Sequence, residues 1–381
     1  MIYMDNAATS FPKPPEVIAA VTAALNAPAS PGRSGHLAAL NASRVIHRAR
    51  KNAAKIFGLT DNTRLAFMAN ITWALNTALD GFGLKAGDHV IASSMEHNSV
   101  ARPLTRLAAE RGITWEAVPA GADGLTQPDE FKKLLKPNTR LVAVNHASNV
   151  TGALTSPEEI KRLIGDVPLL VDTAQTAGAM DLSGLGLWAD MIAFTGHKGL
   201  LGPTGTGGLW VRDGLDLRPL AVGGTGSASE SLIPPDFMPD AFEAGTANTH
   251  GLAGLAAGLD YVLTQGPENI RRHEMELTAR FIDGLSRIRG ANVHGPKTPE
   301  NRVATVAVSL KGWVSSDLAG ALEKEAGILT RAGLHCAPLG HRALGTFEQG
   351  GLTRFSFGPF NTAEEIDTAV AALDKLAFQK R

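Results

Sequence analysis

Short apolar runs alternate with helix-like segments between Pro15 and Leu220, and this alternation restricts the possible folds more than any other feature of the chain. Such alternation with short connections is typical of βα units, which build a mainly parallel sheet covered by helices. The expected strands span 64–68, 89–93, 114–118, 141–145, 169–171, 191–194 and 205–211, and the expected helices span 72–83, 100–111, 127–135 and 157–164. The sequence therefore predicts an α/β domain with a mainly parallel seven-stranded sheet.

The pattern changes beyond this domain. Residues 221–248 are rich in Gly, Ser and Pro, so we expect an extended loop beside the functional site. A helical stretch over 251–289 precedes expected strands at 303–310, 328–331 and 352–357 and expected helices at 316–326 and 363–377, which predicts a smaller α+β C-terminal domain. We expect three parts: an N-terminal segment (1–14) near the functional site, a large domain (15–255) and a small domain (256–381).

Charge and cysteine content exclude several classes of function. The 36 basic and 37 acidic residues are interspersed and give a net charge of -1, which argues against a nucleic-acid or anionic-lipid surface and favours small-molecule chemistry. The N-terminus has an acidic residue at position 5 and no long apolar run, so we expect a cytoplasmic protein. The single cysteine, Cys336, excludes an internal disulfide framework and a multi-cysteine metal site, and we expect no metal. It lies in a glycine-containing stretch over 332–351 that we expect to be a mobile loop.

The segment FTGHKG places Lys198 directly after an expected strand and ahead of the glycine-rich LLGPTGTGG. Glycines let the backbone approach a ligand closely, and a lysine amine in such a position can bond to a carbonyl cofactor. Taken alone, a lysine here is more often a solvated loop residue. The neighbouring motifs favour the cofactor interpretation.

Asp172 ends an expected strand 26 residues before Lys198. An aspartate at this position can pair with a protonated pyridine nitrogen and make the ring an electron sink, with Gln175 bonded to a ring oxygen. The alternative is an ordinary turn or helix-cap aspartate. The following segment, TAQTAGAMD, is not a convincing helix.

Three further polar positions follow expected strands. Ile71 and Thr72 lie at the start of an expected helix, where free amides and the helix dipole bind phosphate, although Thr72 could also be a simple N-cap. His97 could lie on a cofactor ring and carry protons near neutral pH, or be an ordinary polar loop residue. Asn149 supplies another polar group at a strand end.

Eight segments of the chain, in order, resemble the class V, fold-type I pyridoxal-5′-phosphate (PLP) enzymes, and most closely the cysteine desulfurases of the SufS-like group. They are YMDNAATSFPKP, MEHNSV, SNVTGA, VDTAQTAG, FTGHKGLLGPTG, FEAGTANT, RAGLHCAP and RFSFGPFNT. By this resemblance Lys198 would hold PLP covalently, Asp172 would pair with the pyridine nitrogen and Gln175 would contact the ring hydroxyl. His97 would stack on the ring, and Asn149 would contact the substrate or a ring oxygen. The resemblance also implies a set of phosphate contacts, with the last one contributed across a homodimer interface: Thr72, Thr195, His197 and Thr246.

Arg354 matches the family's substrate-carboxylate arginine, and its guanidinium fork suits a bidentate carboxylate, although an arginine in a strand can also have no such role. Arg331 matches an arginine for which we expect a supporting role in substrate binding. Cys336 follows His335 in a glycine-rich stretch, where a thiol is accessible and can become a thiolate. The alternative is a buried apolar cysteine. The resemblance aligns Cys336 with the desulfurase nucleophile.

The resemblance implies a cytoplasmic homodimeric enzyme of iron-sulfur cluster assembly that converts L-cysteine to L-alanine and leaves a persulfide on Cys336 for an unknown protein acceptor. Selenocysteine lyase activity, a class V aminotransferase or epimerase, and a non-catalytic scaffold are the alternatives. Two positions depart from the family pattern: Leu334 replaces a histidine that often precedes the His-Cys pair, and Trp73 stands where many relatives have Glu. These departures bear on the rate and the sulfur acceptor more than on the cofactor.

Overall fold

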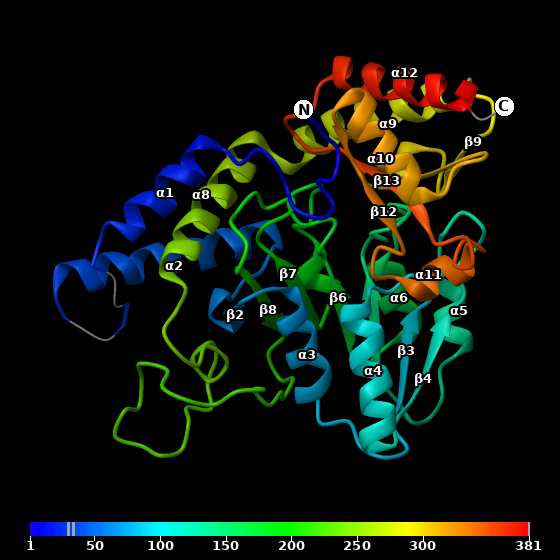
Figure 1. Cartoon of the computed structure of the whole chain (residues 1–381). Coiled ribbons are helices and arrows are strands. Elements are labelled where there is room, and N and C mark those ends of the chain that lie inside the picture. The colour runs from blue at the N-terminus through cyan, green and yellow to red at the C-terminus, as the bar shows by residue number, and fades with distance from the viewer. Residues whose placement is uncertain (29–30, 33–34, 380–381) are drawn as a thin grey trace.

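The computed structural model describes residues 1–28, 31–32 and 35–379 (Figure 1), so residues 29–30, 33–34 and 380–381 lie outside the description. Its central element is a seven-stranded sheet in the order β2-β8-β7-β6-β5-β3-β4. The strands, in that order, are Leu65–Met68, Gly207–Val211, Met191–Thr195, Leu169–Asp172, Thr139–Asn145, His89–Ser93 and Thr114–Val118. Only β8 runs antiparallel to its neighbours, β2 and β7, so the predicted mainly parallel seven-stranded sheet is confirmed.

Both faces of the sheet are buried, which explains why its strands are continuous apolar runs. In β6, Leu169 and Val171 pack in one core with side chains of α2 (Leu37–Ile56), α5 (Pro128–Lys133), α6 (Pro157–Ile164) and α8 (Thr249–Gln265). Leu170 packs in a second core with α3 (Ile71–Gly81) and α4 (Asn98–Arg111). Successive strand residues point to opposite faces, so the sheet lies between two helical layers.

Several helix boundaries differ from the prediction for local chemical reasons. The expected helix over 251–289 is two helices, α8 and α9 (Pro267–Ser286), because Gly266 has a φ of 81° and Pro267 starts a new helix. Helices α3 and α4 begin earlier than expected, because Asn70 and His97 cap them. Helix α6 begins after Ser156, as predicted. Two further helices belong to the part of the chain around the seven-stranded sheet. They are α1 (Pro15–Leu25), which packs on α8, and the short α7 (Leu185–Trp188).

The C-terminal part of the chain is built on a separate four-stranded antiparallel sheet. Its order is β12-β13-β10-β9, with strands Arg331–Gly333, Leu352–Ser356, Thr305–Leu310 and Ala291–His294. Residues of α9, α10 (Ser315–Ala326) and α12 (Ala363–Gln379) share one apolar core with β10 and β13. The α+β character is as predicted, but β9 is an additional strand, and its half-buried residues carry only a weak apolar signal.

Two expectations about the C-terminal part are wrong. The single strand expected at 328–331 is two strands, since β11 (Ile328–Leu329) pairs with β1 (Ile2–Tyr3) and β12 pairs with β13. Residues 332–351 are not simply a mobile loop, because they contain part of β12 and helix α11 (Pro338–Ala343). Backbone packing orders this region: at Gly351 a Cβ would meet the Gly333 carbonyl oxygen at 2.1 Å.

Among the described residues, no helix combines the length and apolar character needed to cross a membrane.

Candidate active site

Four of the predicted site residues lie at or just after the carboxyl ends of four parallel strands. Lys198 follows β7, Asp172 ends β6, Asn149 follows β5 and His97 follows β3. These strands lie next to one another in the order β7-β6-β5-β3. Parallel strands bring their carboxyl ends to one edge of a sheet, where open α/β folds bind their ligands. The sheet therefore gathers residues that are more than 100 positions apart in the sequence.

The amine of Lys198 and the carboxyl of Asp172 perturb each other's ionisation. Desolvation lowers the pKa of Lys198 to about 8 against the opposing charge of Asp172, and Arg354 and Arg331 lower it further. Burial raises the pKa of Asp172, whereas a hydrogen bond from the Ala174 amide and the charge of Lys198 oppose the rise. A lysine with a lowered pKa has a larger neutral, nucleophilic fraction near neutral pH, as a Schiff-base lysine requires.

The N-terminal segment fastens the turn that carries Lys198. The Ser10 hydroxyl donates to the Lys198 carbonyl oxygen at 2.9 Å, and the Ser10 amide donates to the His197 carbonyl at 3.0 Å. Lys13 Nζ donates to the same His197 carbonyl at 2.9 Å, and burial lowers the pKa of Lys13 to about 8. These contacts restrict the backbone at Lys198 from the side of the N-terminal segment.

The start of α3 offers backbone donors that the helix itself does not use. The side chain of Asn70 caps the helix by accepting from the Trp73 amide at 3.1 Å, so the N-cap is Asn70 and not Thr72. Ile71 and Thr72 are the first two residues of the helix, where amides lack intrahelical acceptors. Because β2 runs parallel to β7, this helix start lies at the same sheet edge as Lys198. It is a suitable anion site.

Three more of the predicted cofactor contacts, from Gln175, Thr195 and His197, are engaged with the protein. Gln175 Nε2 donates to the Ala7 carbonyl at 3.2 Å. The buried Thr195 hydroxyl lies 3.4 Å from the Thr206 carbonyl, and His197 Nδ1 lies 3.1 Å from Thr9 Oγ1. Their predicted contacts with PLP stay predictions.

His97 is the N-cap of α4 as well as a site residue. Its Nδ1 accepts from the Ser99 amide at 3.0 Å, which assigns the proton of the neutral ring to Nε2. Burial lowers the pKa of His97 to about 4, and the positive charges of Lys198, Arg331, Arg102 and Arg354 act in the same direction. The ring is thus neutral at physiological pH, with an N–H available as a donor.

Arg354 lies in β13 of the four-stranded sheet and is almost completely buried. It contacts Asn149 at the edge of the seven-stranded sheet where Lys198 lies. Its Nη2 donates to Asp5 Oδ1 at 2.6 Å, and its Nη1 donates to the Asn149 carbonyl at 2.9 Å. Arg354 Nε and Asn149 Oδ1 are both buried without a hydrogen-bond partner among the described residues. Unpartnered buried polar atoms are rare and indicate a site for a polar ligand.

Two hydrogen bonds connect the loop carrying Cys336 to residues that follow strands of the seven-stranded sheet. The Asn98 amide donates to the Cys336 carbonyl at 2.7 Å, and Asn149 Nδ2 donates to the His335 carbonyl at 2.7 Å. The thiol itself is exposed, so the alternative of a buried apolar cysteine is wrong. Its Sγ lies 3.7 Å from Nη2 of Arg331, so a positively charged side chain adjoins the only thiol of the chain.

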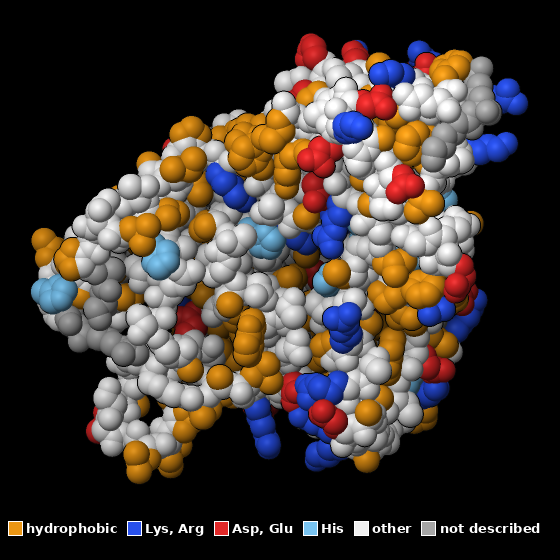
Figure 2. Space-filling model, viewed as in Figure 1, with side chains coloured by type: hydrophobic (Ala, Val, Ile, Leu, Met, Phe, Trp, Pro, Cys, Tyr) orange, Lys and Arg blue, Asp and Glu red, His pale blue; other side chains and the backbone are white. Residues whose placement is uncertain are grey.

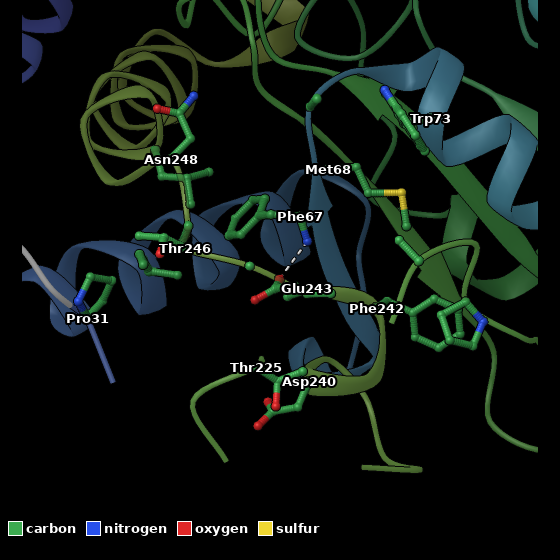
Figure 3. A pocket seen from close by; sticks show the side chains of 18 of the residues that line it. Pro31, Phe67, Met68, Trp73, Thr225, Asp240, Phe242, Glu243, Thr246 and Asn248 are labelled. Atoms are coloured by element: carbon green, nitrogen blue, oxygen red, sulfur yellow. Dashed lines mark hydrogen bonds between the residues drawn. The ribbon is translucent and has the colours of Figure 1, made fainter. Parts of the chain in front are cut away.

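Thr246 and Trp73 line a separate open cavity of about 740 Å³ (Figure 3). Glu243 lies in its wall, where it accepts from the Phe67 amide at 2.6 Å and from Arg50 Nη1 at 2.7 Å. Thr246 is exposed, and among the described residues it forms no hydrogen bond with another predicted site residue.

Figure 2 shows positive and negative side chains interspersed over the visible face, as the sequence predicts.

The residues at the sheet edge fit PLP. Lys198 supplies an amine of lowered pKa, Asp172 a buried carboxylate, Ile71 and Thr72 free helix amides, and Asn149 Oδ1 an unpartnered acceptor. Within the described residues, no cluster of three or more His, Cys, Asp or Glu side chains is arranged to hold a metal ion. The donor set therefore matches a phosphorylated pyridine aldehyde better than a metal centre.

Sequence reasoning did not single out several residues that complete the site: Asp5, Ser10, Lys13 and Asn98. Asp5, Ser10 and Lys13 lie in the YMDNAATSFPKP segment, so the motif itself was the available signal. Asn98 acts through its backbone amide, which residue identity does not reveal.

Comparisons with known proteins agree with this geometry. The family model of class V aminotransferases matches residues 2–369. A probable cysteine desulfurase of Methanothermobacter thermautotrophicus is 34% identical over 99% of this chain and 94% of that protein. The apo structure of a cysteine desulfurase from Thermococcus onnurineus NA1 has a TM-score of 0.91 at 31% identity, covering 99% of this chain and 95% of that one. A cysteine desulfurase of Escherichia coli, solved as the S-sulfonic acid, has a TM-score of 0.89 at 27% identity, covering 100% of this chain and 95% of that one.

Proposed function

The chain belongs to the class V aminotransferase family, and from this premise we propose that it is a PLP-dependent cysteine desulfurase that receives the sulfur of L-cysteine on Cys336. The observation that carries the proposal is the hydrogen bond from the Asn98 amide to the Cys336 carbonyl at 2.7 Å. Asn98 directly follows His97 in the sequence. The bond therefore holds Cys336, which carries the only thiol of the chain, at the sheet edge where Lys198 lies. An aminotransferase or epimerase of this fold has no chemical need for a thiol there.

The cofactor end of the site has distinct tasks for four residues. When bound, PLP would supply an electron sink for negative charge at the substrate α-carbon. Lys198 would hold the cofactor covalently, and its amine would be placed to take the α-proton of the substrate. Asp172 would keep the pyridine nitrogen protonated, and the amides of Ile71 and Thr72 would hold the phosphate. The remaining expected contacts, from His97, Gln175, Thr195 and His197, would orient the ring and phosphate.

Substrate binding uses the buried polar atoms that the protein leaves unpartnered. The carboxylate of L-cysteine accepts from Arg354, whose Nε has no partner in the described chain, and Arg331 adds positive charge beside it. Asn149 Oδ1 accepts from the substrate or a ring oxygen. Arg331 thus serves both the substrate and the thiol, because its Nη2 lies 3.7 Å from Cys336 Sγ.

The sulfur step balances without an external oxidant. The Cys336 thiolate attacks the sulfur of the substrate, so that an S–S bond forms and the substrate Cβ–S bond breaks. The electron pair of the broken bond stays with the substrate carbon, which takes up a proton and leaves as alanine. Cysteine and the Cys336 thiol thus become alanine and a Cys336 persulfide.

The exposed cavity beside α3 supports a homodimer. Trp73 and Phe237 are about half exposed, and Leu232 and Ile233 of the projecting 221–248 segment are more exposed still, which leaves a large apolar surface uncovered. We propose that a second copy covers this surface and receives Thr246 at its phosphate site. We further propose a cytoplasmic enzyme that passes sulfur to a protein acceptor in iron-sulfur cluster assembly.

The test is a single-turnover reaction of the holoenzyme with L-cysteine, analysed by intact-protein mass spectrometry. We expect a mass gain of one sulfur on Cys336 and one equivalent of alanine, and neither product with Cys336→Ser. Full alanine production by Cys336→Ser would contradict the proposal. Turnover of selenocysteine with no turnover of cysteine would assign the site to a selenocysteine lyase instead.

A further inference from the structure

A chain of hydrogen bonds leads from Thr346 through two histidines to the residue before Cys336. Thr346 Oγ1 lies 2.8 Å from His341 Nδ1, and His341 Nε2 lies 3.3 Å from His335 Nδ1. His335 Nε2 lies 3.1 Å from the Arg331 carbonyl oxygen. All three side chains are at most 3% exposed, so water does not compete for these bonds.

The chemistry of the end groups assigns every proton in this chain. The Arg331 carbonyl can only accept, so His335 carries its proton on Nε2 and accepts at Nδ1. His341 then donates from Nε2 and accepts at Nδ1 from the Thr346 hydroxyl. Burial lowers the pKa of His335 to about 3 and that of His341 to about 4, so both rings stay neutral at physiological pH.

The backbone that these bonds support is in an unfavourable conformation. His335 and Cys336 are consecutive non-glycine residues with φ values of 50° and 56°. Left-handed conformations of this kind are unfavourable for non-glycine residues and persist only where surrounding contacts hold them. The Asn149 and Asn98 bonds hold the two carbonyls, and the His335 ring is the side-chain anchor of the turn.

The same bonds remove His335 from acid-base chemistry. Both of its ring nitrogens are engaged, one with the Arg331 carbonyl and one with His341. Although it adjoins Cys336 in the sequence, it has no free nitrogen to accept the thiol proton. Its contribution is therefore geometric.

We propose that His341 and Thr346 are positioning residues for persulfide formation. They fix the ring of His335, which keeps the His335–Cys336 turn left-handed and directs Cys336 Sγ towards Arg331. This inference rests on the proposed function, in which Cys336 is the sulfur acceptor. It assigns a role to two residues that contact neither substrate nor cofactor.

The experiment compares Thr346→Val, which removes the hydroxyl at nearly constant volume, with the conservative Thr346→Ser. His341→Ala and His341→Gln form a second pair, because a glutamine amide can still donate towards His335. Three quantities are measured on each holoenzyme: the single-turnover rate of persulfide formation, the rate of Cys336 alkylation by iodoacetamide without substrate, and the affinity for L-cysteine from the change in cofactor absorbance.

We expect Thr346→Val and His341→Ala to slow persulfide formation by about tenfold or more, as misplacement of a reacting group does. Cysteine affinity stays within about twofold of wild type, because PLP and Arg354 are untouched, and the alkylation rate changes. Thr346→Ser retains the wild-type rates, and His341→Gln recovers part of the loss.

The inference is overturned if Thr346→Val forms persulfide at the wild-type rate, or if persulfide rate and cysteine affinity fall together by the same factor. Should His341→Ala fail to fold, the Thr346 pair decides the question alone. The alkylation rate separates this inference from the proposed function. If Cys336→Ser still made alanine, the function would be wrong, yet an altered alkylation rate in Thr346→Val would still report that Thr346 positions the thiol.

Discussion

Arg354 Nη2 donates to Asp5 Oδ1 across 2.6 Å, which joins the arginine expected to bind substrate to a carboxylate of the chain's own N-terminal segment. The guanidinium is 1% exposed, so the pair is shielded from solvent on the arginine side. Asp5 thus compensates a buried positive charge before any substrate arrives. It also occupies one edge of the guanidinium fork, while Nε has no hydrogen-bond partner among the described residues.

We predict that Asp5→Ala destabilises the protein by about 3 kcal/mol, because removing one partner of a buried ion pair leaves the other charge uncompensated. Urea unfolding of the holoenzyme at a fixed protein concentration measures the change. The matched control is Asp367→Ala, whose partner Arg280 is half exposed, and it should cost much less stability because solvent screens the pair. Equal losses from the two variants would contradict the role assigned to Asp5.

We predict that Arg331→Gln slows both sulfur transfer and alkylation of Cys336 at pH 7. Arg331 Nη2 lies 3.7 Å from Sγ, and removing this cation takes away an electrostatic interaction with the reacting sulfur, with an expected effect of about tenfold. Stopped-flow alkylation with iodoacetamide checks the thiol separately from catalysis. Arg342→Gln, on the helix that follows the loop, is a suitable control and should leave the alkylation rate unchanged. An unaltered rate in Arg331→Gln would show that the contact has no electrostatic effect on the thiol.

We predict that the stability of the wild-type protein falls relative to Glu96→Gln as pH rises from 5 to 8. Burial raises the pKa of Glu96 from its ordinary value of 4.5 to about 8, and the nearby Asp172 adds to the rise. The folded state therefore binds a proton that the unfolded state has released, so stability is lost over this window by roughly 1 kcal/mol per pH unit. Parallel urea titrations of both proteins at several pH values measure the slope. Parallel stability curves would rule out a raised pKa for Glu96.

We predict that Lys198→Ala lowers cysteine turnover by at least about a hundredfold, because it removes both the covalent attachment of the cofactor and the base for the α-proton. The absorbance of lysine-bound cofactor should be lost, while added PLP still binds at the helix amides of Ile71 and Thr72. Lys133→Met is the matched control. It keeps that absorbance, because Lys133 is an exposed residue of α5 whose amine pairs with Glu130.

The central sheet and the residues at its edge were predictable because their signals are local. The apolar run 169–171 and Asp172 directly after it together indicate a strand that ends in a carboxylate. The same holds for Lys198 after β7 and for Ser156 before α6. Each depends on hydrophobic periodicity and on the chemistry of one or two neighbouring residues.

Other features depend on packing between distant segments, and the sequence did not reveal them. The break at Gly266 was hidden within a continuous helical pattern. The stretch over 332–351 was expected to be a mobile loop because it lacks an apolar period, yet pairing with β13 and the bonds from Asn98 and Asn149 order it. Glycine content alone cannot distinguish a flexible segment from one that needs close backbone contacts.

The sequence by itself determined the alternating α/β architecture, the positions of Lys198 and Asp172 at strand ends, and the identity of Cys336 as the only thiol, because these follow from residue type and short-range spacing. Only the tertiary structure decided that Asp5 pairs with Arg354, 349 positions away, and that His341 and Thr346 support the turn at Cys336. Such pairings depend on how the seven-stranded sheet, the four-stranded sheet and the N-terminal segment pack together. No local pattern records that packing.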